Sequence, residues 1–385
     1  MNKLLWGVIA IIGASCFGYL ALQQGETVSA MYLVVAAVCI YMIAYRFYGR
    51  FVAYKVLELD KNRATPAMVN DDGRDFVPTN KSVLFGHHFA AIAGAGPLVG
   101  PILAAQMGYL PSMLWILVGG VFAGAVHDFV VLFISSRRNG KSLGEIIKEE
   151  LGTFVGGVTM IAIFGIMLII IAILSMVVVK ALAESPWGLF TIAMTIPIAI
   201  FMGIYMRYLR PGKVGEASVI GFILLILAIH YGSIIAADPY WKQVFTFDAT
   251  TLAFIMMAYG FIAAVLPVWF LLAPRDYLST FLKIGVIVLM AIAIVIVAPD
   301  IQMPKMNTQY FDGSGPVFAG AIFPFLFITI ACGAISGFHA LISSGTSPKM
   351  LENETHALPV GYGSMLMESA VAIMALICAT ILHPG

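Results

Sequence analysis

The segment GHHFAAIAGAGPLVGPILAAQMG, residues 86–108, is apolar and long enough to cross a membrane, but it is punctuated by helix-breaking residues. Pro97 and Pro101 each remove a backbone donor, and the glycines around them permit non-helical dihedral angles. Backbone groups freed at membrane depth must be satisfied by protein or by a polar cavity. We therefore expect a discontinuous membrane helix here; a packing face of small residues is the alternative.

The composition of the whole chain indicates an integral membrane protein. Hydrophobic residues make up 61% of the 385 residues, charged residues only 11%, and the mean hydropathy is +0.97. Too few polar residues remain to cover a water-exposed surface, so lipid must be the main partner of the outside. A net charge of +1 gives no electrostatic reason to expect a nucleic acid or an acidic partner.

Apolar runs of about twenty residues predict an all-α multi-pass protein with eleven transmembrane helices. The predicted spans are 4–22, 28–45, 87–107, 113–134, 154–182, 187–206, 217–236, 250–272, 281–298, 319–343 and 362–382. Residues 46–86 form a charged, turn-rich connection that is too short for a separate domain. We expect residues 1–385 to form a single membrane domain.

Lysine and arginine fall unevenly on the two sides of these spans. With the N-terminus in the cytoplasm, eighteen of the 21 cationic residues lie on the cytoplasmic side, including Arg275 and Lys283, and only Lys180, Lys242 and Lys305 lie outside. This asymmetry follows the positive-inside rule and supports eleven crossings. His383-Pro384-Gly385 follow the last span without a tail, so we expect the sequence to be incomplete at its C-terminus.

Two further spans carry helix-breaking residues. Span ten continues into the glycine- and serine-rich stretch at 331–349, and Pro267 and Pro274 interrupt span eight. Spans three and eight are five apart, the spacing of inverted five-helix repeats in many transporters. In such proteins, amides of a half-helix bind an anion and unwound carbonyls bind a cation. The predicted substrate-binding residues are accordingly Gly94, Gly96, Pro97, Gly100, Ser343 and Ser344.

Ionisable residues within membrane spans are costly and mark candidate proton sites. Asp128, His339 and Glu368 all lie within predicted spans, and we interpret them as proton-coupling residues. The alternatives are an interhelical bond for Asp128, a packed histidine at 339, and a Glu368 that reaches the interface. His127 points about 100° away from Asp128 around an ideal helix, so the two residues need not act together.

A third group of polar residues lies at the mouths of interrupted spans. His87 and His88 enter span three from the cytoplasmic side, and Arg275 and Asp276 follow the prolines of span eight. These four residues are candidates for a gate. The histidines can equally mark the membrane interface, and Arg275 and Asp276 can be an ordinary surface pair.

Several function classes lack their sequence motifs. The chain contains neither HExxH nor a phosphate-binding GxxxxGK[ST], and its four cysteines lie singly in apolar runs without CxxC spacing. We therefore expect free thiols, no resident metal, no cofactor and no enzymatic activity.

Three stretches are similar to the carbon starvation protein A family: VPTNKSVLFGHHFAAIAGAGPLVGPILAAQMGYLP at 77–111, LPVWFLLAPRDYLSTFLKIG at 266–285, and FHALISSGTSPKMLENE at 338–354. This resemblance implies a bacterial inner-membrane permease that takes up peptides during starvation or, for close relatives, pyruvate with protons. It also implies a fold similar to the amino acid, polyamine and organocation superfamily, with inverted five-helix repeats. Full-length members are longer, so the chain resembles their N-terminal part.

The residues and the resemblance together predict a secondary transporter for small carboxylated nutrients, coupled to protons. Pyruvate and peptides are not separated, because both offer a carboxylate, and the oligomeric state is not predicted. The alternatives are a nutrient-sensing membrane receptor, a passive channel, or an inactive truncated fragment of the transporter.

Overall fold

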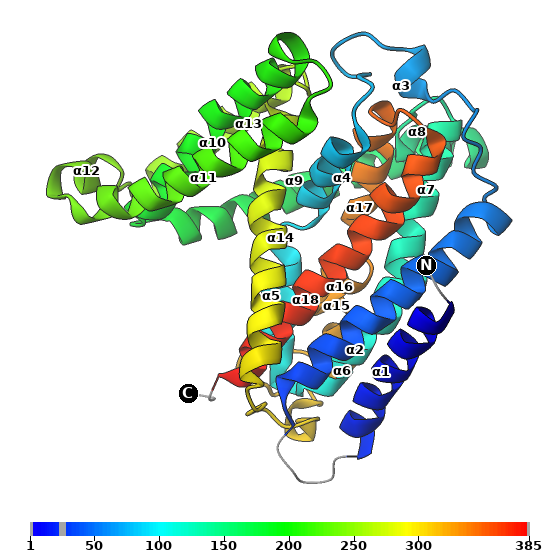
Figure 1. Cartoon of the computed structure of the whole chain (residues 1–385), viewed down its shortest axis with the longest axis vertical. Coiled ribbons are helices and arrows are strands. Elements are labelled where there is room, and N and C mark those ends of the chain that lie inside the picture. Colours follow the sequence, from blue (N-terminus) through cyan, green and yellow to red (C-terminus); the bar gives the residue numbers. More distant parts are fainter. Residues whose placement is uncertain (1–2, 23–27, 383–385) are drawn as a thin grey trace.

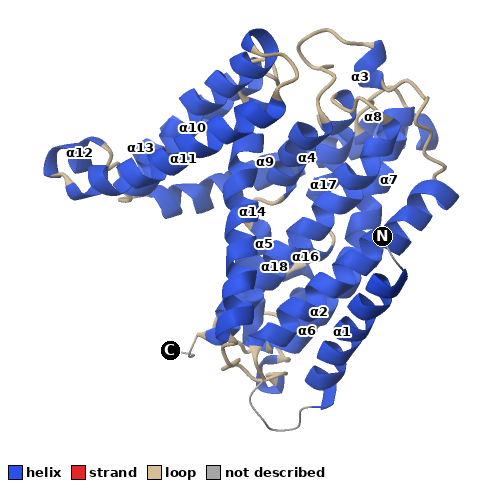
Figure 2. Ribbon diagram, viewed as in Figure 1, coloured by secondary structure: helices blue, strands red, loops and turns tan. Residues whose placement is uncertain are grey.

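A computed structural model describes residues 3–22 and 28–382, and these residues form helices joined by loops (Figure 2). Seven helical stretches are long and apolar enough to cross a membrane, and the bent pair formed by Lys81–Ile92 and Gly96–Met107 makes an eighth. The seven are Ala30–Val56, Tyr109–Arg137, Thr153–Leu182, Pro186–Leu209, Val214–Ala237, Leu272–Val297 and Glu354–Ile381. Two further apolar helices are shorter, at Leu4–Leu20 and Ala249–Val265.

The main bundle holds the core of the protein (Figure 1). Its helices are α1 (Lys3–Leu22), α2 (Ala30–Ile43), α4 (Lys81–Ile92), α5 (Gly96–Ala104), α6 (Tyr109–Gly119), α7 (Ala125–Arg137), α14 (Leu272–Val297) and α18 (Ser364–Ile381). The short helices α15 (Phe327–Thr329), α16 (Ala331–Ala334) and α17 (Gly337–Ser344) pack among them. Helix α18 lies at the centre, since 72% of the residues in the apolar stretch of its span are buried.

A second group of helices projects from the bundle (Figure 1). It contains α9 (Thr153–Leu182), α10 (Pro186–Ile204), α11 (Val214–Ala237), α12 (Pro239–Val244) and α13 (Ala249–Val265). In the apolar stretch of α9, no residue is buried by the described part of the protein. An apolar helix with no buried stripe is typical of a membrane span that faces lipid or a partner within the bilayer.

Polar segments join the spans at one end of the bundle. Residues 57–80 carry only the one-turn helix α3 (Pro66–Val69), and the amphipathic helix α8 (Leu143–Leu151) precedes α9. Ser142 caps α8 through a reciprocal capping box with Glu145, which satisfies otherwise free backbone donors.

Several helix boundaries differ from the predicted spans. Helix α2 continues through π-helical turns to Val56, so the connection predicted at 46–86 narrows to 57–80. Helix α13 ends at Val265, because Leu266 precedes Pro267 and is held in an extended conformation. Helix α14 begins at Leu272 instead of 281, so Lys283 lies about three turns inside the helix instead of at the cytoplasmic end of the predicted span. His383-Pro384-Gly385 lie outside the described residues.

Candidate functional site

The first broken segment is the one that the glycines and prolines of residues 86–108 predict. Helix α4 ends at Ile92, α5 begins at Gly96, and their axes differ by 43°. Pro97 has no N–H to donate to the carbonyl of Ala93, and the N–H of Gly94 donates to Ile92 at 2.9 Å instead of continuing the helix. The sequence therefore frees backbone carbonyls at this break.

The second broken segment is residues 322–344. Helix α16 ends at Ala334, and Ile335 and Ser336 adopt extended dihedral angles before α17 begins at Gly337. The predicted span at 319–343 is therefore interrupted by non-helical backbone, as its glycine- and serine-rich sequence suggested.

The two broken segments run antiparallel to each other. At one end, His87 Nε2 lies 3.2 Å from Thr346 Oγ1, and His88 Nδ1 lies 2.6 Å from Ser347 Oγ. Further along, α5 packs against α15 and α16, so residue numbers rise on one segment as they fall on the other. We call the contact of residues 87–100 with residues 329–347 the crossing.

Two glycines allow the close approach at the crossing. A Cβ atom at Gly96 would lie 2.5 Å from Cys332 Sγ, and one at Gly100 would lie 2.2 Å from the carbonyl oxygen of Thr329. Both positions therefore exclude a side chain without a backbone shift. The segment that packs against the first broken segment is thus in span ten, whereas α13 in span eight ends before Pro267.

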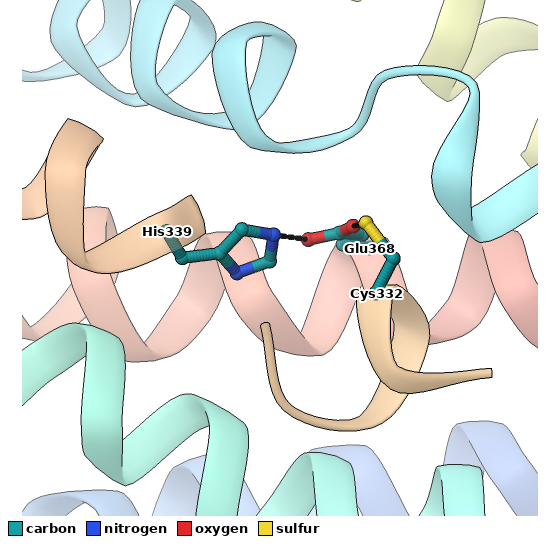
Figure 3. A group of neighbouring side chains, drawn as sticks. All are labelled: Cys332, His339 and Glu368. Carbon is teal, nitrogen blue, oxygen red and sulfur yellow. Dashed lines mark hydrogen bonds and ion pairs between the residues drawn. The ribbon is translucent and has the colours of Figure 1, made fainter. Parts of the chain in front are cut away.

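Asp128, His339 and Glu368 meet at the crossing, although they come from α7, α17 and α18. His339 Nδ1 lies 2.8 Å from Asp128 Oδ2. On the other side of the ring, His339 Nε2 lies 3.0 Å from Glu368 Oε2, as Figure 3 shows. The second contact has ion-pair distance without hydrogen-bond alignment, so Nε2 and Oε2 both lack a hydrogen-bond partner. All three side chains are 0% exposed. An imidazole between two buried carboxylates can accept and pass on a proton.

The buried chain of polar groups extends at both ends. His127 Nδ1 lies 2.9 Å from Asp128 Oδ1, and the His127 side chain is 29% exposed. At the other end, Cys332 Sγ donates to Glu368 Oε1 at 3.2 Å. The 100° angle between His127 and Asp128 around the helix therefore does not keep their side chains apart. The two adjacent side chains are flexible enough to reach each other.

Cys332, His339 and Glu368 also offer the donor set of a metal site. Their ligand atoms all lie within 4.8 Å of one another. Thiolate, imidazole and carboxylate together suit zinc and similar transition metals, and Asp128 would orient the His339 ring from behind. The sequence predicted no metal, because Cys332 and His339 are seven residues apart and Glu368 lies on another helix.

The candidate gate residues have separate partners. His87 Nδ1 pairs with Asp276 Oδ2 at 2.8 Å, which joins α4 to the start of α14. Arg275 instead contacts Thr195 at 3.4 Å, and its guanidinium lies 4.8 Å from the centre of the Tyr259 ring. Asp276 therefore belongs to the crossing, and Arg275 to the contact of α14 with α10 and α13.

The predicted substrate-binding residues occupy different surroundings. Gly94 is exposed at the break, and a Cβ atom added at this position would have no atom within 4 Å. Pro97, in contrast, is buried. Ser343 is buried with its hydroxyl unpartnered. The Ser344 hydroxyl donates to Ala340 O at 2.6 Å and accepts from the amide of residue 143. Gly94 thus has free space beside it, and the Ser343 hydroxyl has no hydrogen-bond partner among the described residues, whereas the Ser344 hydroxyl already has two partners.

Lys283 is a site residue that the sequence pattern did not predict. Its ammonium group on α14 donates to Ala90 O at 2.9 Å and to Ala93 O at 2.8 Å. A lysine within the predicted span 281–298 was the available signal. Its position as the third residue of that span placed it on the cytoplasmic side and concealed the signal.

Two hollows are lined by other residues than those of the crossing. A cleft of about 290 Å³ opens near the 77–80 connection, and Arg207 stacks on Trp269 in its wall. An apolar groove of about 360 Å³ lies between α2, α4 and α18. Its lining is Val38, Tyr41, Met42, Tyr45, Phe85, Pro359, Gly363, Leu366, Met367 and Ala370.

Comparisons with known proteins agree with the sequence resemblance. The chain is 85% identical over 384 residues to the peptide transporter CstA of Campylobacter jejuni, covering 100% of this chain and 55% of the relative. It is 63% identical over 380 residues to the pyruvate/proton symporter BtsT of Escherichia coli, covering 99% of this chain and 53% of the relative. The peptide transporter CstA of Escherichia coli is 61% identical over 389 residues, covering 100% and 55%.

These relatives are transporters and not enzymes, as the missing catalytic motifs predicted. The chain spans about half the length of the curated relatives it matches. No solved structure matches it. The family described as carbon starvation protein CstA matches residues 29–385. The protein is therefore a multi-pass membrane protein, and it belongs to the carbon starvation protein CstA family.

Proposed function

We propose that the complete protein containing this chain is a secondary transporter of the bacterial inner membrane. It takes up a small carboxylated nutrient, a peptide or pyruvate, together with protons. The observation that carries the proposal is the buried series of Glu368, His339 and Asp128, linked at 3.0 and 2.8 Å. Names of relatives as a peptide transporter and a pyruvate/proton symporter support it.

In this mechanism the proton moves along the buried side chains. His127 is the partly exposed end through which a proton enters or leaves, and Asp128 holds it next to His339. The His339 ring then passes a proton to Glu368 through its second nitrogen. Complete burial of the three groups supports a functional role, since buried ionisable groups in a membrane protein are costly to keep.

The substrate carboxylate binds at the crossing in this proposal. Gly94 leaves open space at the break, and the first turn of α5 presents the positive end of a helix dipole toward that space. Gly96, Pro97 and Gly100 then act mainly by bringing the two broken segments together. The unpartnered hydroxyl of Ser343 is available for a further polar contact.

The proposed membrane topology has eleven transmembrane spans, with the N-terminus in the cytoplasm. Seven long spans, the bent pair, the two shorter apolar helices and the second broken segment add up to this number. Antiparallel pairing of the two broken segments supports an inverted repeat. Within it, α4–α7 would correspond to residues 322–381. The His87–Asp276 pair is the proposed gate, with His88 beside it.

Uptake of labelled pyruvate and of a labelled dipeptide tests the function. The complete protein and this chain are each expressed in cells that lack related permeases, and uptake is measured with and without a protonophore. Protonophore-sensitive accumulation by the complete protein is expected. Uptake that follows the substrate gradient and ignores the protonophore would identify a passive channel. The absence of uptake of both substrates by the complete protein would refute the proposal.

A further inference from the structure

The broken helix already has a cation bound to it, and that cation is part of the chain. The Lys283 ammonium donates to the carbonyl oxygens of Ala90 and Ala93 at 2.9 and 2.8 Å. Lys283 lies on α14, which packs closely along α4, so the ammonium reaches the break from a neighbouring helix.

Both carbonyls have lost their helical donors for identifiable reasons. In a continuous helix, Ala93 would accept from residue 97, but Pro97 has no N–H. Ala90 would accept from Gly94, whose N–H donates to Ile92 instead. At the C-terminal end of α4 these oxygens also carry the negative end of the helix dipole, which favours a cation. The ammonium therefore satisfies two acceptors that the break itself creates.

Few other charges act on this ammonium group. Asp276 and Arg275 lie about two turns away on the same helix, and Glu368 acts on it from α18. Asp276 is paired with His87 on α4, and Arg275 contacts α10 and α13. The carbonyls are therefore the direct partners of Lys283 in the described part of the chain.

We propose that Lys283 is a tethered cation that occupies, at the break between α4 and α5, the position where a coupling metal ion binds in other carriers with broken helices. Unwound carbonyls and half-helix C-terminal ends coordinate sodium in such carriers. Here an ammonium group from α14 makes the equivalent contacts. The inference rests on the proposed transport function and adds that transport requires no sodium ion.

Chemical rescue tests the inference on the purified complete protein. Lys283→Ala removes the propylammonium part of the side chain, and added n-propylammonium supplies the same group. Thermal unfolding is measured with n-propylammonium and with tetramethylammonium, which has equal charge but no N–H donor. Lys180→Ala, at an exposed position on α9, is the matched control. We expect Lys283→Ala to unfold at a lower temperature and to be restabilised saturably by n-propylammonium alone.

Uptake provides the second measurement. Lys283→Ala should reduce proton-driven accumulation at least tenfold, with partial recovery in n-propylammonium, and the unchanged protein should accumulate substrate equally in sodium and in choline media. Lys283→Gln covers the case in which the alanine variant does not fold, because its amide keeps N–H donors without charge. We expect Lys283→Gln to fold and to lose accumulation.

Three results would overturn the inference. These are a sodium requirement in the unchanged protein, wild-type accumulation by Lys283→Gln, and equal stabilisation of Lys283→Ala by the two ammonium ions. If the complete protein transports neither substrate, the proposed function fails on its own. The unfolding measurement still decides whether Lys283 fills a cation site.

Discussion

Replacing Asp128 by asparagine should uncouple substrate movement from proton movement in the complete protein. The Asp128 carboxylate contacts two imidazole rings, His127 at 2.9 Å and His339 at 2.8 Å, and it is fully buried. Asparagine has the same shape but only one acceptor oxygen, so one ring loses its partner. A hydrogen bond to a charged group contributes about 1.5–3 kcal/mol. Because about 1.4 kcal/mol is a factor of ten, the equilibrium for protonating the network should shift roughly ten- to a hundredfold.

The accumulation that coupling to protons can drive differs between the two substrates. A zwitterionic dipeptide that moves with one proton carries one charge, and a potential of 100 mV supplies about 2.3 kcal/mol, or roughly fiftyfold accumulation. A pyruvate anion with one proton carries no net charge, so only the pH gradient acts on it. An uncoupled Asp128→Asn variant should equilibrate either substrate without accumulating it.

Proteoliposomes with an imposed potential and an imposed pH gradient measure this directly. Substrate exchange at equilibrium, without any gradient, shows whether the variant still binds and moves substrate. Asp300→Asn is the matched control, because it is the same chemical change at an exposed position. Exchange without accumulation is the expected result for Asp128→Asn. Undiminished accumulation in that variant would refute the role of the buried network.

Gly100→Ala should cost about 1–3 kcal/mol of stability and abolish uptake, since its Cβ atom would lie 2.2 Å from a backbone carbonyl oxygen. Gly94→Ala should fold normally, because its Cβ atom would have no atom within 4 Å. Thermal unfolding of the two variants tests this difference. Arg137→Ala should destabilise the protein by about 3 kcal/mol, because the buried Glu354 carboxylate loses its ion-pair partner and keeps the Asp60 N–H as a donor. Glu354→Ala should cost less, because the guanidinium left behind is 29% exposed. Micromolar Zn²⁺ should inhibit uptake, and Cys332→Ala should raise the inhibitory concentration at least tenfold; equal inhibition of both proteins would contradict a metal-binding cluster.

The break in the first broken segment was predictable because its cause is local. Pro97 removes a specific donor, and glycines relieve the steric limits on the dihedral angles of the same turn. The same argument found the second broken segment at 331–349. Which two breaks meet in space is a matter of tertiary packing. Spacing along the chain related span three to span eight as repeats and gave no information on contacts, whereas the close approach of Gly96 to Cys332 shows that span three packs against span ten.

The residues of the buried network were predictable one by one, but their contacts were not. Asp128, His339 and Glu368 each stand out as ionisable groups in apolar runs. Cys332 and His127 gave no such signal, since a buried cysteine behaves as a small apolar residue and a single histidine often packs without function. Their participation depends on side-chain directions that only the folded backbone sets.

Lys283 shows how a helix boundary changes a functional assignment. The apolar run that ends α14 begins near residue 281, so Lys283 reads as a cytoplasmic anchor at the very end of the span. In the structure the helix begins at Leu272, and the same lysine contacts the break. A shift of nine residues in one boundary therefore separates a topology marker from a site residue.

The charges around the crossing predict how proton binding and substrate binding are linked. Asp128 and Glu368 are two carboxylates and Lys283 is one ammonium, so in the state in which all three are ionised and the His339 ring is neutral the group has a net charge of −1. This charge repels a substrate carboxylate, and one proton cancels it. Apparent substrate affinity should therefore rise as the pH falls, and by reciprocity substrate should favour proton uptake. Asp128→Asn also cancels the charge, so in that variant the affinity measured by equilibrium binding should lose its pH dependence. A pH dependence equal to that of the unchanged protein would show that the coupling charge lies elsewhere.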